Sequence, residues 1–300
     1  MATSDDPVAV LGTGAIGSAV TRALLGSGRP VIVWNRTAAR TDPLVDAGAA
    51  RAATAAEALA AAPLSVLTLT DYVAVDALLE ASISTDLAGR AVVALVTGSP
   101  EDARAAARRV GTTGASYLDG GIHASPESIG TPAATLLLSG SASAFAEHAP
   151  TLELLGTPRF IGEEPDAAAT LDLALYGAWY DAQLGLLRAL ELVRTAGVDI
   201  DQFAELVAAQ LDHVPRGVTH VVGEVRAGVF PPGPATLVEH LVMLEQLVAV
   251  RGQSSLGAGG LDAVAARIER EIADGQGKLG LTSLVSGVVL ASEGDGSRWQ

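Results

Sequence analysis

The chain has 300 residues, of which 49% are hydrophobic and 18% charged, and its formal net charge at pH 7 is −15. This length accommodates two domains with cores of their own, and the apolar content excludes wholesale disorder. The negative charge argues against binding to nucleic acid or to an anionic membrane, because both need clustered Lys and Arg. Cysteine is absent, which excludes disulfides, thiolate metal sites and Cys nucleophiles.

The amino terminus, MATSDDPVAV, is acidic and lacks the basic and then apolar pattern of a secretory signal. Every apolar run long enough to span a membrane is interrupted by charge. We therefore expect a cytoplasmic protein with neither a membrane nor a nucleic acid as its partner.

Up to about Gly162, short apolar runs alternate with helical stretches. The runs of strand length and aliphatic content are residues 8–12, 31–35, 65–70, 91–96, 116–122 and 135–140. Ala-rich helical segments such as 14–28 and 99–111 lie between them, and we expect the Ala-rich stretch 47–62 to be helical as well. Strands and helices in alternation predict an α/β domain with a parallel sheet covered on both faces.

After Gly162 the pattern becomes purely helical. Residues 163–197 predict one long helix, about 166–195, with an acidic and proline-bearing start and a glycine at its end. Further helical segments lie around residues 199–214, 220–228, 235–252, 261–275 and 279–290. The PPGP sequence at 231–234 separates two of them. We therefore place a second, all-α domain over residues 163–300, opened by the long interdomain helix.

The sequence GTGAIG places Gly12, Gly14 and Gly17 in a G-x-G-x-x-G pattern. It follows an apolar strand, opens a helix and precedes another strand, which is the context that dinucleotide binding requires. In such a loop Gly12 allows the tight turn, Gly14 lets the backbone approach a pyrophosphate, and Gly17 lets helix and sheet pack closely. The pattern predicts a dinucleotide-binding Rossmann domain over residues 1–162. A glycine-rich turn without a ligand is the alternative.

The end of the second strand indicates which dinucleotide binds. An NAD site normally has Asp or Glu there for the ribose 2′-hydroxyl, whereas this chain has Asn35, Arg36 and Thr37, with Arg40 one turn later. No carboxylate repels a 2′-phosphate, and two guanidinium groups can bind it, so we expect NADPH rather than solvated surface arginines. The predicted cofactor residues are Gly12, Thr13, Gly14, Ala15, Ile16, Gly17, Asn35, Arg36, Thr37, Arg40, Leu69, Thr70 and Thr97.

The long helix carries ionisable groups on an apolar background. Asp172, Tyr176 and Tyr180 follow one another at steps of four residues and therefore share one helical face. A nicotinamide enzyme must combine hydride transfer with control of a proton, and Asp172 between Leu171 and Leu173 would be partly desolvated, with a raised pKa. The alternatives are an Asp that only complements the helix dipole and tyrosines that only pack in a core.

Four features in this order and spacing resemble the imine reductases, which belong to the β-hydroxyacid dehydrogenase or 6-phosphogluconate dehydrogenase-like superfamily. They are the GTGAIG fingerprint, the WNRT segment, the loop LDGGIHASPESIG and the long interdomain helix. The resemblance covers essentially the whole chain. It implies an NADPH-dependent oxidoreductase that reduces the C=N bonds of cyclic imines and iminium ions to amines, and an interlocked homodimer.

The same resemblance implies roles for single residues. The hydroxyacid dehydrogenases carry a catalytic Lys and an Asn on this helix, where the present chain has Asp172 and Tyr176, and its only lysine is Lys278. In the imine reductases this position is Asp or Tyr, with a substrate-contacting Tyr two turns later, here Tyr180. Relatives that couple ketones to amines carry Asn in the loop after the fifth strand, where this chain has Ala94.

Two other functions remain open from the sequence. One is a β-hydroxyacid or small-carbonyl dehydrogenase using Tyr176 or Lys278 as its acid, and the other is a non-catalytic NADP(H)-binding regulatory protein. The histidines show no metal-ligand spacing, so we expect no metal. The expected substrate pocket, to which the partner subunit contributes, consists of His123, Trp179, His213, His240 and Met243.

Overall fold

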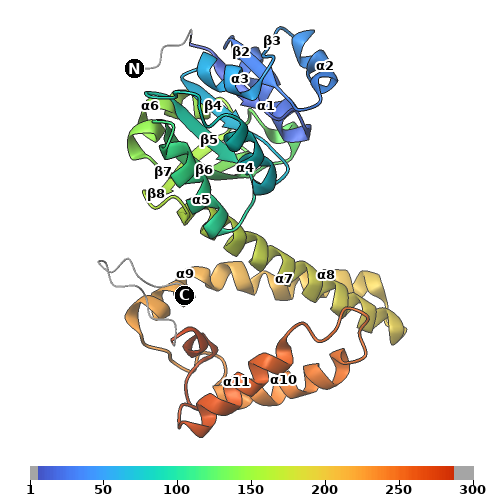
Figure 1. Cartoon of the computed structure of the whole chain (residues 1–300). Helices are drawn as coiled ribbons and strands as arrows, with labels where there is room; N and C mark the ends of the chain where they lie inside the picture. The colour runs from blue at the N-terminus through green and yellow to red at the C-terminus, as the bar shows by residue number, and fades with distance from the viewer. Residues whose placement is uncertain (1–5, 287–300) are drawn as a thin grey trace. The chain divides into compact units, whose positions relative to one another are not determined.

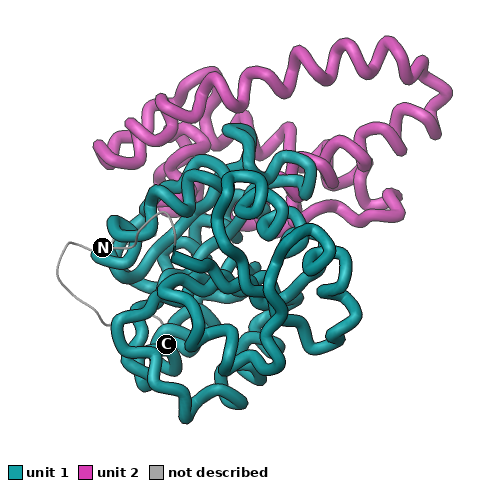
Figure 2. Tube along the Cα trace, turned by 90° about the horizontal axis from the view of Figure 1, so that it is seen from above, with its two compact units in different colours: residues 1–177 teal, residues 178–300 magenta. Residues whose placement is uncertain are grey.

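The computed structural model describes residues 6–286. The chain divides into two compact units, Met1–Gly177 (unit 1) and Ala178–Gln300 (unit 2), which Figure 2 colours separately. Across residues 6–286, no helix combines the length and the apolar character that a membrane span needs.

Unit 1 is built on one sheet with the strand order β3-β2-β1-β4-β5-β6-β7-β8. All neighbouring strands run parallel except β6 and β7, which are antiparallel. The strands are β1 (Val8–Leu11), β2 (Val31–Trp34), β3 (Ala50–Arg51), β4 (Leu64–Leu67), β5 (Ala91–Leu95), β6 (Ser116–His123), β7 (Thr135–Gly140) and β8 (Thr157–Gly162). The predicted α/β class with a mainly parallel sheet is confirmed.

Helices cover both faces of this sheet (Figure 1). One apolar core joins the sheet to α1 (Ala15–Gly26), α2 (Asp42–Val45) and α6 (Ala142–Leu152). The other joins it to α3 (Ala55–Ala61), α4 (Tyr72–Ala81) and α5 (Pro100–Gly111). Along β1, Val8 and Val10 belong to the first core, whereas Ala9 and Leu11 belong to the second. Because both faces are buried, the strands are continuously apolar, which made them recognisable in the sequence.

The prediction of a helix over residues 47–62 is wrong in its first half. Gly48 has a φ of +108°, a left-handed conformation that suits glycine, and Ala50 pairs with Ile32 in the sheet. Helix α3 begins only after Thr54, whose side chain accepts a hydrogen bond from the Glu57 amide. The two-residue strand β3 is too short to leave an alternating pattern in the sequence.

Helix α7 (Ala167–Thr195) runs through the boundary between the two units, and unit 2 continues with helices alone among the described residues. They are α8 (Ile200–Leu211), α9 (His213–Ala227), α10 (Leu237–Arg251), α11 (Leu261–Ala273) and the short 3₁₀ turn η3 (Leu281–Val285). The predicted all-α character is therefore confirmed. Of the helix expected over 279–290, the described part contains only η3, and residues 287–290 lie outside the description.

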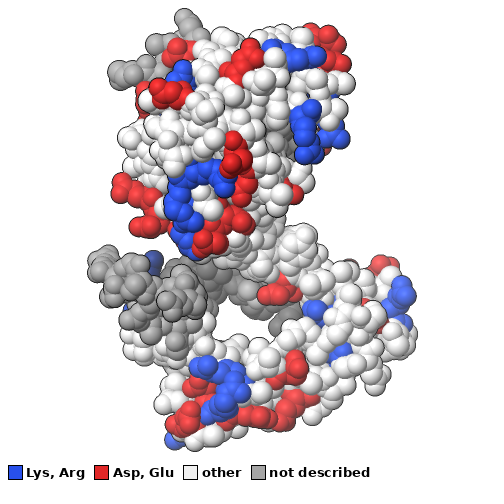
Figure 3. All heavy atoms as spheres, in the orientation of Figure 1, with Lys and Arg blue, Asp and Glu red and all other residues white. Residues whose placement is uncertain are grey.

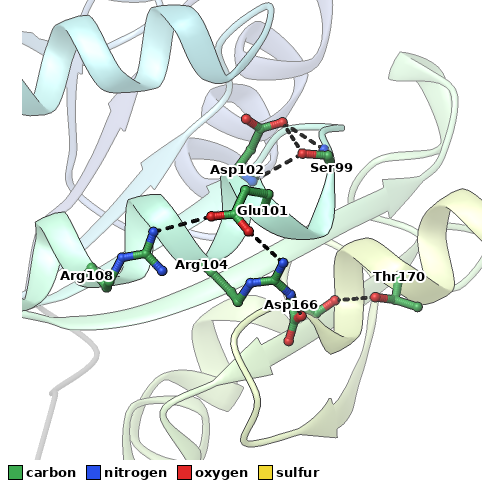
Figure 4. A network of polar contacts seen from close by, with 7 residues as sticks. All are labelled: Ser99, Glu101, Asp102, Arg104, Arg108, Asp166 and Thr170. Atoms are coloured by element: carbon green, nitrogen blue, oxygen red, sulfur yellow. Dashed lines mark hydrogen bonds and ion pairs between the residues drawn. The ribbon is translucent and has the colours of Figure 1, made fainter. Parts of the chain in front are cut away.

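The start of α7 is tied to the sheet by polar contacts within unit 1. The Ala168 amide donates to Ser139 Oγ at 2.9 Å, and Ser139 Oγ donates to the Pro165 carbonyl oxygen at 3.2 Å. Arg104 of α5 forms an ion pair with Asp166 (Figure 4). The Ser139 hydroxyl thus satisfies a backbone amide and a carbonyl group at the start of the helix. Together with the ion pair, it fixes the first turn of α7 against β7 and α5.

Candidate active site

The crevice expected for a dinucleotide lies where the strand order reverses, at the carboxyl ends of β1 and β4. A cavity of about 720 Å³ opens there, which is the size of small-molecule sites in proteins. Of the predicted cofactor residues, those that line it are Gly12, Thr13, Gly14, Asn35, Arg36, Thr37, Arg40, Leu69 and Thr70. Ala15, Ile16, Gly17 and Thr97 are not among its lining residues.

The three fingerprint glycines differ in what surrounds them. Gly12 has a φ of +102°, and a Cβ atom there would lie 2.5 Å from the Thr68 carbonyl oxygen. A Cβ atom on Gly17 would lie 2.0 Å from the Gly12 carbonyl oxygen, so both glycines serve the packing of the chain itself. Gly14 has no atom within 4 Å of its Cβ position and caps α1 without a side chain. The first amides of α1 are thereby left accessible to an anion.

Polar contacts hold the segment after β2 against the glycine loop. The Thr13 amide donates to Asn35 Oδ1 at 3.2 Å, and Thr13 Oγ1 donates to the Arg40 carbonyl oxygen at 3.3 Å. Arg36 and Arg40 are exposed at the cavity. Within the part of the chain that the structure describes, no ion pair involves either guanidinium. Both positive charges are therefore available to an anionic group.

Asp172 lies 2% exposed on α7, against the end of β6. Its Oδ1 is 2.7 Å from Nε2 of His123, the last residue of β6, and both of these atoms are buried. Burial raises the pKa of Asp172, while the neighbouring His123 and Thr97 side chains offset part of this. The site thus holds a desolvated acid with one imidazole beside it.

The expected reason for the burial of Asp172 is wrong. Its helical neighbours Leu173 and Leu175 are 40% and 46% exposed, so they do not enclose the carboxyl group. Instead, the carboxyl group packs on β6, where a Cβ atom on Gly121 would lie only 2.3 Å from Asp172 Oδ1. The absence of a side chain at Gly121 therefore creates the space that the acid occupies.

The predicted stripe of Asp172, Tyr176 and Tyr180 is divided between the two units. The Tyr176 ring stacks on His123, with 5.0 Å between ring centroids and 20° between ring planes. Tyr180 belongs to unit 2, where its ring meets Trp179 edge to face at a centroid distance of 4.9 Å. The remaining predicted pocket residues, His213, His240 and Met243, also lie in unit 2, on α9 and α10.

A second buried acid near the site was not predicted from the sequence. Asp119 of β6 is 1% exposed, and Oδ1 of Asp119 accepts hydrogen bonds from the hydroxyl groups of Tyr72 and, at 2.9 Å, Tyr117. Burial is the main cause that raises the pKa of Asp119 to about 6, and the negative charge of Asp172 raises it further. In the sequence LDGGIH, alternate residues share one face of the strand, so this pattern alone would have placed Asp119 and His123 on the same face.

Comparisons with known proteins agree over residues 7–289, apart from residue 163. The family described as "NAD binding domain of 6-phosphogluconate dehydrogenase" matches residues 7–162, and "NADPH-dependent reductive aminase-like, C-terminal domain" matches residues 164–289. The NADPH-dependent reductive aminase of Aspergillus oryzae is 30% identical, over 93% of this chain and 95% of that protein. The chain belongs to the imine reductase and reductive aminase family.

Solved structures of the family have the same fold. The reductive aminase from Aspergillus terreus, in complex with NADPH and ethyl-5-oxohexanoate, has a TM-score of 0.84 and 34% identity, covering 94% of this chain and 98% of that one. An imine reductase from the same organism, in complex with NADPH4 and dibenz[c,e]azepine, has a TM-score of 0.86 and 34% identity, with 94% and 99% covered. The predicted family is therefore confirmed.

One expectation taken from the resemblance needs correction. Ala94 lies inside β5 rather than in the loop after it, is completely buried, and packs in the core beneath α3, α4 and α5. It pairs with Asp119 across the parallel strands β5 and β6. Its side chain is therefore part of the sheet's core and neighbours the buried carboxyl group of Asp119.

The contrast between Gly14 and Gly17 gives a paired prediction. Gly17→Ala places a Cβ atom against the backbone of Gly12 and should lower the free energy of unfolding by about 1–3 kcal/mol, measured by denaturant titration. Gly14→Ala should leave that stability unchanged, because its φ of −69° and its open surroundings suit alanine. It should weaken dinucleotide binding at least about tenfold by obstructing the pyrophosphate. Equal stability losses in both variants would contradict this division of roles.

Proposed function

We propose that this protein is an NADPH-dependent imine reductase, in which Asp172 assists at the substrate nitrogen. The observation that carries the assignment is a buried carboxyl group, paired with an imidazole, in a member of the imine reductase and reductive aminase family. Its substrates are cyclic imines and iminium ions, which it reduces to amines. Residues 1–162 form the cofactor domain and residues 163–300 the helical domain. A cytoplasmic location is part of the proposal.

The described residues fit NADPH. Gly14 leaves room at the amino-terminal end of α1 for a pyrophosphate, and the guanidinium groups of Arg36 and Arg40 line the cavity, where they can bind a 2′-phosphate. Relatives of this chain include an enzyme named NADPH-dependent and a structure in complex with NADPH. When bound, the nicotinamide supplies the hydride that reduces the carbon of the C=N bond.

The protein's own contribution is control of the proton. An imine nitrogen is more basic than a ketone oxygen and is reduced most readily as the iminium ion. Asp172, whose pKa is raised by burial, can donate a proton to that nitrogen, and its carboxylate then stabilises the cation that results. Tyr176, stacked on His123 in unit 1, is assigned to the same catalytic group. Tyr180 is assigned a contact with the substrate, as the resemblance implies.

Unit 2 supports the proposal of a homodimer. Its helices expose large apolar side chains, among them Leu206 of α8 at 65%, Val214 of α9 at 67% and Met243 of α10 at 61%. On the face seen in Figure 3, the charged side chains of this unit leave broad uncharged stretches between them. Exposed apolar area of this extent is typical of a subunit interface. We therefore assign these helices to contacts with a second copy, whose residues complete the substrate pocket with Trp179, His213, His240 and Met243.

Replacement of the proposed acid tests the mechanism. Asp172→Asn keeps the shape of the side chain but removes the acid, and turnover of a 1-pyrroline-type imine should fall by about 10²- to 10⁴-fold. Affinity for NADPH should not change, because Asp172 does not line the cofactor cavity. Steady-state NADPH oxidation and a fluorescence titration measure the two effects. The exposed Asp46, changed to Asn, serves as control. Unimpaired turnover in Asp172→Asn would remove the proposed acid.

Cofactor preference tests the two arginines. In Arg36→Ala and Arg40→Ala, kcat/KM for NADPH should fall at least about tenfold, since a charge-assisted hydrogen bond contributes about 1.5–3 kcal/mol. The kcat/KM for NADH should stay the same, because NADH has no 2′-phosphate. Arg159→Ala changes an exposed arginine outside the cavity and is the matched control. If both variants retain the preference for NADPH, the 2′-phosphate is bound elsewhere.

A charged residue introduced on the exposed apolar surface of α8 tests the proposed dimer. Leu206→Glu should leave a monomer as stable as before, since Leu206 is 65% exposed within the subunit. If helices of two copies bury this face, the variant should instead shift the mass measured by size exclusion with light scattering from dimer to monomer. A wild-type protein that elutes as a monomer would refute the proposal directly.

A further inference from the structure

His123 and Asp172 differ sharply in their access to water. The two side chains meet at 2.7 Å between Nε2 and Oδ1, yet 27% of the His123 side chain is exposed and only 3% of the Asp172 side chain. The carboxyl group is therefore closed to bulk water on the side of unit 1, whereas the imidazole that touches it reaches the surface. Histidine exchanges protons readily near neutral pH, which suits it to pass a proton between water and a buried acid.

No other base in the described part of the chain serves Asp172. His123 is the one cation that acts on its carboxyl group, and Thr97 contributes a hydroxyl that does not titrate. Among the other charged groups nearby, Asp119 is acidic and is held by two phenols, and Asp166 is neutralised by Arg104. Within unit 1, His123 is therefore the basic group in contact with Asp172 through which a lost proton can be replaced.

We propose that His123 is the proton relay of this site, which returns a proton from water to Asp172 after each turnover. This inference rests on the proposed function, in which Asp172 gives its proton to the imine nitrogen. Asp172 is left as a carboxylate when the substrate carbon receives its hydride. His123 then passes its Nε2 proton to Asp172 Oδ1 while the other ring nitrogen, Nδ1, takes up a proton from water, because Nε2 itself is buried against the acid. One hydride and one solvent proton thus convert the neutral imine to the amine.

Tyr176 holds the relay in position. Its ring lies nearly parallel to the imidazole at a centroid distance of 5.0 Å, so the stacked phenol holds the imidazole beside the carboxyl group. Gly121 acts from the other side, since it lets Asp172 approach the strand that carries His123. Tyr176 and Gly121 are thus positioning residues for the relay, and the stacking contribution of Tyr176 needs a ring but no hydroxyl group.

The test compares a substrate that needs a proton with one that does not. A neutral cyclic imine of the 1-pyrroline type must gain a proton at nitrogen, whereas its N-methylated iminium salt carries a permanent positive charge. NADPH oxidation is measured with both substrates between pH 6 and pH 9. At pH 9, where water supplies few protons, His123→Asn should reduce the neutral imine at least about tenfold more slowly than the wild type. It should reduce the N-methylated iminium at the wild-type rate.

Two controls accompany this variant. His220→Asn removes an exposed histidine that also lies beside a carboxylate, Glu224, at 2.9 Å, and it should behave as wild type with both substrates. The N-methylated iminium also reports on folding, because a misfolded His123→Asn protein would lose activity with both substrates.

Each outcome decides the proposal. Loss confined to the neutral imine and growing with pH supports a relay, and rates that are unchanged with both substrates overturn it. An equal loss with both substrates also overturns it, because His123 would then only shape the site. Failure of the proposed function is seen separately: if Asp172→Asn reduces the neutral imine normally, Asp172 is not the acid, whatever His123→Asn does.

Discussion

The close contact between α7 and β6 is the constraint on which the rest of the site depends. An isolated carboxylate in a position as buried as that of Asp172 is costly unless a partner or a proton compensates its charge. Here the end of β6 supplies the partner, His123, and Gly121 supplies the space, since a Cβ atom there would lie 2.3 Å from the acid. Ser139 and Arg104 hold the first turn of α7 in place through Ala168 and Asp166, and these contacts help to fix the point along β6 that Asp172 faces.

The α/β fold of unit 1 was predictable because burial on both faces makes each central strand a short apolar run. The strands that the sequence did not predict lack this signal: β3 has two exposed residues, and β8 is only half-buried and contains Pro158. The reversal of β7 against β6 also left no mark in the sequence. No residue in either run indicates its direction, which is set by the path of the connecting loop, residues 124–134.

The candidate site was less predictable for a specific reason. Helical periodicity tells which residues share a face with Asp172, but not which strand lies against that face. It therefore suggested leucines of the same helix, whereas the structure encloses the acid with Gly121 and His123 of β6. The pairing of His123 with Asp172 joins residues 49 positions apart in the printed sequence, and no local pattern records it. The roles of the predicted site residues, including those of unit 2, remain predictions.

An acid at this helical position suits a nitrogen substrate better than a lysine would. A lysine is positively charged at neutral pH and would repel an iminium ion, whereas a carboxyl group that gives up its proton becomes an anion beside the cation it has made. For that cycle the carboxyl group must be protonated before the reaction, which burial promotes, and must be able to recover its proton afterwards, which burial alone would prevent. An imidazole in contact with both the acid and the surface resolves this conflict.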